Sequence, residues 1–435
     1  MIWIAPRGVA ALVAAGVLAF ALAHVEPWPL AGAIALLLVA VLAGLDALAL
    51  RSRLDVEREE PPRLALARRD AFTYEIANRA ATARRVAVVE APVQKLAIDL
   101  AEAVAVVPAR SRTSVRIGVV PRERGETALR SFHVRIRTRL GLLERRRALR
   151  EPVALRVMPD LSALDRGGDL VARTKLLDAG LRRLRRRGSG GEFASLREYG
   201  PDDDFRAIDW KASARRGKAM VATYEVERAQ QIVVALDCGR LMAARLGDRR
   251  KLDYAVAAGL AIAAMGRLAA DRVGVYAFAA KPIARVLPAS GTPHAARLTD
   301  VLSDVEPRFE ESDYERAMVD LRHTLRRRSL VVLFTVLFDP IASIAVLAAT
   351  QLLTPRHLVL VVLMNDAAIA GALRAVPQRA SDAYRAAVAA TLAEERARAV
   401  ATLRERGVLV VDVPAPELTL ALLDAYVDIK TRGLL

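Results

Sequence analysis

Residues 192–237 read EFASLREYGPDDDFRAIDWKASARRGKAMVATYEVERAQQIVVALD, and the organisation of the rest of the chain follows from them. The first part of this stretch is dense in charged side chains, whereas its end, Ile232–Leu236, is an uninterrupted apolar run followed by Asp237. A short apolar run of this kind is typical of a strand that is buried on both faces of a parallel sheet. The stretch therefore predicts a charged connecting segment that leads into the first strand of an α/β domain.

Downstream of this strand, apolar runs of strand length alternate with longer runs of helical periodicity. Strands separated by helices favour a mostly parallel, doubly wound sheet with helices on both faces. We predict such an α/β domain over residues 232–435. Its further strands are expected at 272–279, 330–337, 357–364 and 408–413, and its helices at 252–268, 293–302, 314–326, 342–352 and 380–406.

Upstream of the charged segment, residues 63–159 contain several short stretches in which apolar and polar residues alternate. Alternation with period two is typical of strands that have one buried and one solvated face. Several such strands separated by turns predict a small β-sandwich over residues 63–159, and residues 160–231 are then a connector. The expected strands include 72–76, 85–89, 114–120, 132–137 and 153–157.

Two apolar runs precede the sandwich, Gly8–Ala23 and Trp28–Leu50, and the only charge in them is Asp46. Each run has, or nearly has, the length that a helix needs to cross about 30 Å of hydrocarbon. Residues 1–50 are therefore expected to form a two-helix transmembrane hairpin in which Asp46 has a structural role; a cleaved signal peptide is the alternative for the first run. Arginines after the second run would keep the soluble domains in the cytoplasm and make the chain a multi-pass protein of the inner membrane.

The composition argues against several classes of function. The formal net charge is +17, yet only 5% of the residues are aromatic and no nucleic-acid-binding motif interleaves with the basic runs, so nucleic acid is not an expected partner. The single cysteine, Cys238, cannot form a disulfide within the chain. The histidines form no HExxH motif, and the sequence has neither a P-loop nor a dinucleotide-binding glycine motif. We therefore expect no enzymatic activity and no cofactor.

The charged segment has three interpretations. In the first, Asp202–Asp204 start a short helix over residues 205–215 with Ile208 and Trp210 buried, and the surrounding charges form an ion-pair network that holds the segment to the next domain. In the second, the same side chains are a docking surface for a partner protein. In the third, acid chemistry of a hydrolase is carried by the carboxylates of Asp203, Asp204 and Asp209.

The segment carries a specific combination of residues: Arg197, Tyr199, Asp203, Asp204, Arg206, Asp209, Trp210, Ser213, Arg215, Glu225 and Glu227. It resembles the signature of the bacterial domain-of-unknown-function 58 family, and the resemblance covers most of the chain. It implies a membrane-anchored protein with a β-sandwich and a von Willebrand factor A-like domain. Genes of the family often neighbour genes for MoxR-type AAA+ ATPases. The resemblance thus implies a non-enzymatic adaptor that acts with such an ATPase and the lipid bilayer in the assembly or maturation of envelope complexes.

A von Willebrand factor A-like domain raises the question of a metal site, because that fold holds Mg²⁺ with an Asp-x-Ser-x-Ser loop, a threonine and a second aspartate. Here the loop begins at Asp237, but Gly239 and Leu241 supply no hydroxyl group. Residues 311–315 contain no equivalent threonine, and Thr335 stands where the second acid is expected. We therefore predict a degenerate site without metal; the alternative is a metal-dependent module that binds a protein carboxylate.

Overall fold

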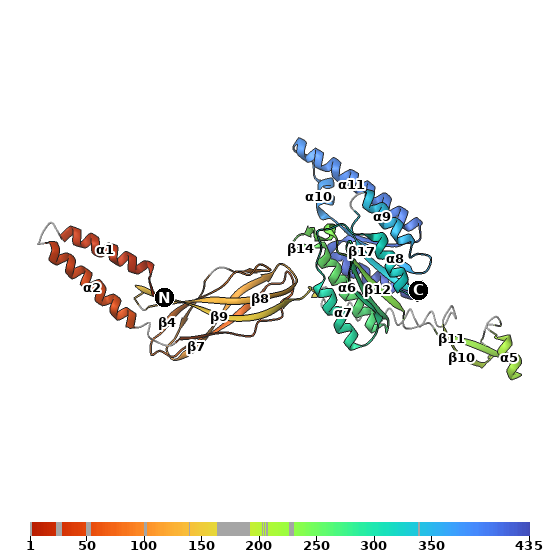
Figure 1. Cartoon of the computed structure of the whole chain (residues 1–435), viewed down its shortest axis with the longest axis horizontal. Helices are drawn as coiled ribbons and strands as arrows, with labels where there is room; N and C mark the ends of the chain where they lie inside the picture. Colours follow the sequence, from red (N-terminus) through yellow and green to blue (C-terminus); the bar gives the residue numbers. More distant parts are fainter. Residues whose placement is uncertain are drawn as a thin grey trace. The chain divides into compact units, whose positions relative to one another are not determined.

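The chain divides into two compact units, residues 1–158 and 159–435, and each is described by itself (Figure 1). The computed structural model describes residues 2–22, 28–48, 54–99, 102–138, 140–162, 192–201, 203, 205, 208–225, 230–337 and 340–435.

The first unit contains two antiparallel sheets that share one core. The strand order is β1-β9-β8-β4-β6 in the first sheet and β2-β3-β7-β5 in the second. Phe72, Tyr74 and Ile76 alternate along β3, are fully buried and belong to the same core as Phe132 of β8. Two sheets packed face to face form a sandwich. Its strands are β1 (Ile2–Ile4), β2 (Leu54–Arg58), β3 (Asp70–Asn78), β4 (Arg84–Glu90), β5 (Leu96–Ile98), β6 (Ala103–Val107), β7 (Ser111–Pro121), β8 (Gly125–Arg137) and β9 (Leu143–Val157).

A buried ion pair joins the two sheets of the sandwich. A guanidinium nitrogen of Arg58 on β2 lies 3.1 Å from a carboxylate oxygen of Glu90 on β4, and the two side chains are only 1% and 0% exposed. Tyr74 of β3 donates its hydroxyl proton to the same carboxylate. Burial, reinforced by Glu90, raises the pKa of Tyr74 well above its ordinary value, so the phenol keeps the proton that it donates.

Helices α1 (Pro6–Leu22) and α2 (Trp28–Leu48) also belong to this unit. Within the described ranges, no helix combines the length and the apolar composition that crossing a bilayer requires. The predicted transmembrane hairpin, and with it the multi-pass location in the inner membrane, is therefore wrong.

Asp46 attaches the last turn of α2 to the sandwich. Its carboxylate is 3% exposed and accepts hydrogen bonds from the backbone N–H groups of Leu140 and Leu142, at 3.1 and 3.2 Å, and from the hydroxyl of Thr138. Because a buried carboxylate needs such donors, this end of the helix is fixed to the turn between β8 and β9. The structural role predicted for Asp46 is confirmed.

The second unit contains a six-stranded sheet of order β16-β15-β12-β17-β18-β19. Strand β12 lies in the middle and is parallel to both of its neighbours, β15 and β17. All strands are parallel except β16, which pairs antiparallel to β15 at the edge. The strands are β12 (Gln231–Asp237), β15 (Arg272–Phe278), β16 (Pro282–Ala289), β17 (Ser329–Thr335), β18 (Leu358–Asn365) and β19 (Leu409–Pro414).

Helices cover both faces of this sheet, as the doubly wound prediction requires (Figure 1). Val234 and Leu236 of β12 face a core that includes residues of α6, α7 and α12, whereas Val233 and Ala235 face a core that includes residues of α8, α9 and α11. The two cores explain why β12 is apolar without alternation. The helices are α6 (Lys251–Leu268), α7 (Thr292–Asp304), α8 (Tyr314–Thr324), α9 (Pro340–Gln351), α10 (Ala367–Arg374), α11 (Ala380–Glu405) and α12 (Leu418–Arg432).

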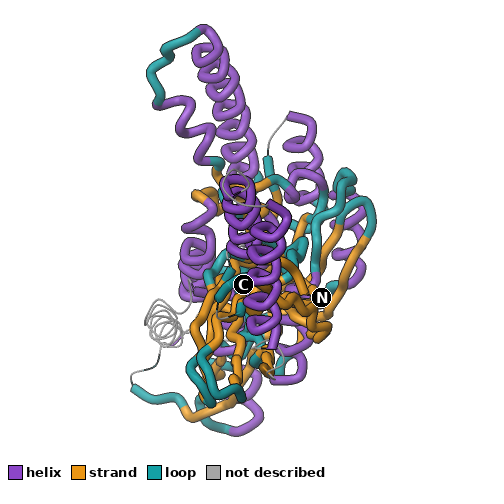
Figure 2. Tube along the Cα trace, turned by 90° about the vertical axis from the view of Figure 1, so that its left-hand side faces the viewer, coloured by secondary structure: helices purple, strands orange, loops and turns teal. Residues whose placement is uncertain are grey.

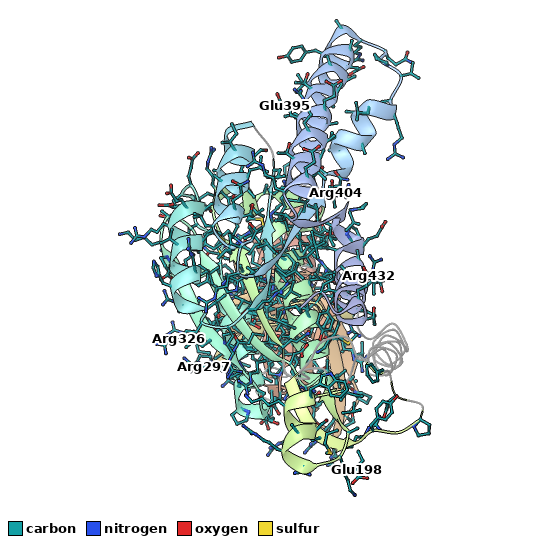
Figure 3. The ribbon with its side chains drawn as sticks, turned by 90° about the vertical axis from the view of Figure 1, so that its right-hand side faces the viewer. Glu198, Arg297, Arg326, Glu395, Arg404 and Arg432 are labelled. Carbon is teal, nitrogen blue, oxygen red and sulfur yellow. The ribbon has the colours of Figure 1, made fainter. Side chains whose placement is uncertain are left out.

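Several elements of this unit were not predicted. Strand β16 contains two prolines, which are confined to edge strands because they cannot donate to a ladder. Helices α10 and α12 were also missed, and the pair α10–α11 extends beyond the sheet (Figure 2), with Glu395 and Arg404 placed along α11 (Figure 3). Short additional elements are η3 (Arg240–Ala243), β13 (Arg245–Leu246), β14 (Arg249–Arg250) and η4 (Ala415–Glu417).

Candidate functional site

The charged segment folds into a small hairpin with a helix inside it, residues 192–225, which we call the signature hairpin. Strands β10 (Glu192–Glu198) and β11 (Met220–Glu225) pair antiparallel, and α5 (Trp210–Arg216) lies between them in the sequence. The helix starts five residues later than predicted, because Asp209 is its N-cap and accepts a hydrogen bond from the N–H of Ala212 at 3.0 Å. It ends at Gly217, whose φ of 67° suits a left-handed C-cap.

Ser213 fastens α5 to strand β11. Its hydroxyl donates to the carbonyl oxygen of Asp209 at 2.7 Å and accepts from the N–H of Met220 at 2.8 Å. The N–H of Asp209 in turn donates to the carbonyl oxygen of Met220 at 2.9 Å. Two signature residues, Asp209 and Ser213, therefore hold the helix in a fixed orientation.

Arg197 and Asp203 form an ion pair within the hairpin. Nη1 of Arg197 lies 2.6 Å from Oδ2 of Asp203, and its Nη2 contacts the other carboxylate oxygen. The carboxylate also accepts the N–H of Gly200 at 2.9 Å. The hydrogen bond from Arg197, followed by that from Gly200, lowers the pKa of Asp203. Among the described side chains, a second pair, Glu198 with Lys218 at 2.9 Å, likewise joins two residues of the hairpin.

Two aromatic side chains of the hairpin, Phe205 and Trp210, are largely exposed to solvent. Ile208 is 9% exposed, as predicted, but Trp210 is 62% exposed, so the prediction that it is buried is wrong. Phe205 is 64% exposed and contacts Trp210 edge to face, with 5.4 Å between the ring centroids. Tyr199 is 36% exposed. Nothing in the sequence distinguishes a tryptophan that anchors a core from one that is displayed.

The other signature residues have less defined places. Arg215 is exposed in the last turn of α5. Glu225 is the last residue of β11 and pairs in register with Glu192. The predictions for Asp202, Asp204, Arg206 and Glu227 lie outside the described residues.

A second cluster of polar side chains surrounds Asp237 at the carboxyl end of β12. Asp237 is 1% exposed and accepts hydrogen bonds from the N–H of Gly239 at 2.8 Å, from Tyr314 at 2.7 Å, from Thr335 at 2.9 Å and from Ser312. The hydroxyls of Tyr314 and Thr335 are also 2.9 Å apart. Since each hydroxyl has one proton, Thr335 donates either to Asp237 or to Tyr314. Sequence reasoning missed Ser312 and Tyr314, which reach Asp237 from 75 and 77 positions away.

This donor set does not fit Mg²⁺, which prefers several hard oxygen ligands in octahedral array. Both oxygens of Asp237 accept protons from N–H or O–H groups, and a Cβ at residue 239 would collide with the hydroxyl of Ser312. Arg240 lies beside the cluster and pairs with Glu311 at 2.6 Å. In the described part of the chain, no group of three or more His, Cys, Asp or Glu side chains could hold a metal. The degenerate site stays a prediction, with a physical reason for it.

Residues 195–396 match the family model described as "Protein of unknown function DUF58". An uncharacterized protein of Mycobacterium tuberculosis (strain ATCC 25618 / H37Rv), Rv1480, is 27% identical over 228 residues, which are 47% of this chain and 72% of the relative. An uncharacterized protein of Bacillus subtilis (strain 168), YeaD, is 43% identical over 44 residues, which are 10% of this chain and 11% of the relative.

Two solved structures are similar to a part of the chain. The conserved hypothetical protein BatB from Bacteroides thetaiotaomicron is 13% identical, with a TM-score of 0.28, and the match covers 46% of this chain and 99% of BatB. The SpRpn10 VWA domain is 9% identical, with a TM-score of 0.27, and the match covers 45% of this chain and 95% of that domain.

Proposed function

We propose that this chain, whose residues 195–396 match the DUF58 family model, is a non-enzymatic adaptor that binds a partner protein through the signature hairpin. The observation that carries the proposal is the exposed aromatic pair of Phe205 and Trp210, which are 64% and 62% exposed. Tryptophan contributes much of the binding energy at many interfaces, because its large ring fills a pocket on the partner and is thereby removed from water. Two adjacent exposed rings on one small hairpin therefore favour a binding surface.

Hydrogen bonds and an ion pair hold the described parts of the hairpin around Trp210. Asp209 caps α5, Ser213 bonds both to the helix and to β11, and Arg197 pairs with Asp203. A surface that is ordered before binding loses less conformational entropy when the partner arrives. In this reading the polar signature residues build the surface and the aromatic ones contact the partner.

We propose a MoxR-type AAA+ ATPase as the partner, and the support for this choice is the family resemblance. The chain itself has no nucleotide-binding motif, so any use of ATP would belong to the partner. Helix α5 also exposes Lys211, Arg215 and Arg216. These charges would favour a partner that has an acidic surface next to the pocket that accepts the aromatic rings.

The absence of enzymatic activity is part of the proposal. A carboxylate that acts as an acid or a base needs access to a substrate and a pKa matched to its task. Asp203 is held by Arg197 and Gly200, which lower its pKa, and Asp209 caps a helix. Asp203 and Asp209 thus have structural partners in place of a shared catalytic arrangement.

Capture from cells tests the proposal. The tagged full chain is crosslinked in cells, and the captured proteins are identified and compared with those captured by the double variant Phe205→Ala/Trp210→Ala. We expect the MoxR-type ATPase to be enriched with the wild type and lost with the double variant.

A matched control removes a different exposed aromatic side chain. Tyr384 on α11 is 73% exposed, and Tyr384→Ala should leave capture of the ATPase unchanged. Failure to enrich the ATPase over an unrelated bait, or equal capture by the double variant, would refute the proposal.

A further inference from the structure

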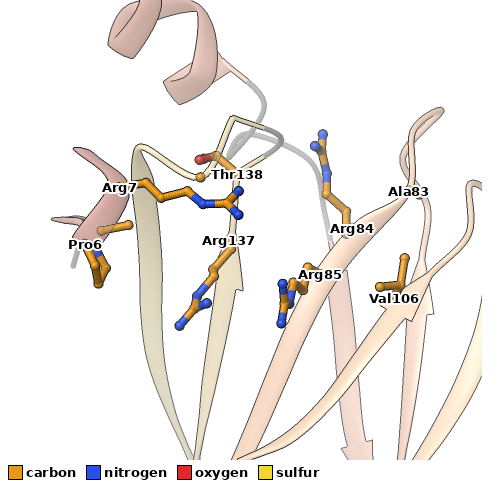
Figure 4. A pocket seen from close by; sticks show the side chains of 10 residues that line it. Pro6, Arg7, Ala83, Arg84, Arg85, Val106, Arg137 and Thr138 are labelled. Atoms are coloured by element: carbon orange, nitrogen blue, oxygen red, sulfur yellow. The ribbon is translucent and has the colours of Figure 1, made fainter. Parts of the chain in front are cut away.

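A pocket rich in arginine lies in the first unit, between the start of α1 and the ends of strands β4, β6 and β8 (Figure 4). Its volume is about 430 Å³. We call it the arginine pocket, and it is lined by Ala5, Pro6, Arg7, Ala83, Arg84, Arg85, Val106, Arg137, Thr138 and Gly141. It shares no residue with the signature hairpin.

The lining of the arginine pocket contains four guanidinium groups and no carboxylate. Arg85 of β4 and Arg137 of β8 are direct partners in the antiparallel register. Like charges directly opposite on neighbouring strands repel each other and destabilise a sheet. An anion placed between them would convert this repulsion into attraction.

The nearby carboxylates do not neutralise all of these arginines. Glu144 on β9 lies 3.8 Å from Arg137, but it is buried and also pairs with Arg146. No described carboxylate forms an ion pair with Arg7 or Arg85. Positive charge therefore accumulates at the pocket and favours an anionic ligand.

The backbone around the pocket positions Arg7 over it. The N–H of Ala5, next to the start of α1, donates to the carbonyl oxygen of Leu142 at 2.8 Å. Gly141 has a φ of 74°, and a Cβ at this position would lie 3.3 Å from Cδ of Arg7. Glycine suits position 141 for two reasons: its backbone is left-handed, and the side chain of Arg7 passes close to it. Figure 4 shows Arg7 reaching in from α1, whereas Arg84 and Arg85 extend in different directions from β4.

We propose that the arginine pocket binds the phosphate group of a small phosphorylated molecule. Planar guanidinium groups donate two parallel hydrogen bonds to phosphate oxygens, which makes arginine a preferred ligand for phosphate. The volume of about 430 Å³ exceeds the size of one phosphate and lies within the range of roughly 300–1,000 Å³ found for small-molecule sites. Ala5, Pro6 and Val106 offer apolar contacts to the remainder of the ligand. The hydroxyl of Thr138 is already engaged with Asp46, so recognition depends on the arginines.

Calorimetric titration of the full chain tests the proposal. Glycerol 3-phosphate, orthophosphate and glycerol are titrated at one fixed ionic strength, because phosphate contacts depend on salt. We expect saturable binding of glycerol 3-phosphate and none of glycerol. Tighter binding of orthophosphate than of glycerol 3-phosphate would support the same site with free phosphate as its ligand. Lack of saturable binding of both phosphates would overturn the proposal.

Two variants locate the binding. The double variant Arg85→Gln/Arg137→Gln should weaken phosphate binding by roughly tenfold or more, as expected for the loss of charge-assisted hydrogen bonds. Arg130→Gln removes a charge from an exposed position on the same strand, β8, that does not line the pocket, and it should leave the affinity within about twofold. Because Arg137 also lies 3.8 Å from the buried Glu144, the melting temperature of the double variant is measured without phosphate to establish that it folds. Equal weakening by Arg130→Gln would show attraction by overall charge and overturn the assignment.

Discussion

At the scale of single residues, His357 shows how burial alone can make folding depend on pH. It precedes β18, is 3% exposed, and neither ring nitrogen has a hydrogen-bond partner among the described residues. Burial, followed by the charge of Arg356, lowers the pKa of His357. The imidazole is therefore neutral in the folded chain, and protonation favours the unfolded state.

The sign of this pH dependence follows from linkage. A histidine whose pKa is depressed by folding contributes stability above its unfolded pKa of about 6.5, and that stability is lost as the pH falls through the folded pKa. We expect the melting temperature of the wild type to fall between pH 7.5 and 5.5 more steeply than that of His357→Phe. The measurement is thermal unfolding by circular dichroism across this range, and parallel curves for the two proteins would contradict the account.

Tyr314 permits a test of the cluster around Asp237. The variant Tyr314→Phe removes one donor from a buried carboxylate, which costs about 1–3 kcal/mol when no other donor replaces it. We therefore expect chemical denaturation to show a loss of stability of that order. The conservative control is Tyr384→Phe, which removes an exposed hydroxyl and should change stability by less than about 0.5 kcal/mol.

The same cluster predicts the response to magnesium. Because the donors around Asp237 do not fit Mg²⁺, up to roughly 10 mM Mg²⁺, well above the weakest millimolar oxygen-ligand sites, should leave the melting temperature of the wild type unchanged. A saturable rise of the melting temperature with Mg²⁺ that Asp237→Asn abolishes would contradict the degenerate site.

At the scale of elements, the sequence patterns predicted where the strands lie better than they predicted which side chains are buried. The strand expected at 72–76 lies within β3, and the strand expected at 232–236 lies within β12, because apolar periodicity reflects burial directly. Periodicity could not reveal that Arg58, a charged residue at the end of β2, is buried against Glu90 between the sheets. Nor could it reveal β16, because its prolines are typical of a loop.

The ion pair of Arg58 and Glu90 predicts how strongly the two sheets depend on each other. Removing one partner leaves the other charge buried without compensation, which costs about 3–5 kcal/mol. We expect Glu90→Ala to lower the free energy of unfolding of the sandwich by about that amount in denaturant titration. Glu75→Ala is the control, since Glu75 pairs with Arg112 at an exposed position and should cost less than about 1 kcal/mol. Similar losses for the two variants would show that burial of the pair is unimportant.

At the scale of the whole molecule, the doubly wound sheet and the match of residues 195–396 to the DUF58 model were predicted, whereas the membrane hairpin was not correct. The apolar runs at the N-terminus contain helices, as expected, but composition alone did not show that Asp46 is buried against the turn between β8 and β9. The signature residues were found from their pattern, yet their roles could not be. Trp210 is 62% exposed, and Asp209 caps a helix.

The central claim is that the exposed aromatic pair of the signature hairpin binds a MoxR-type ATPase, and the most direct test is the affinity between the two purified proteins. Biolayer interferometry would compare the wild type with Phe205→Ala/Trp210→Ala and with Tyr384→Ala. The account predicts that the double variant weakens binding by at least about tenfold, as for loss of an interface hot spot, while Tyr384→Ala changes it by less than about twofold. Undetectable binding of the wild type, or equal affinity of the double variant, would contradict the account.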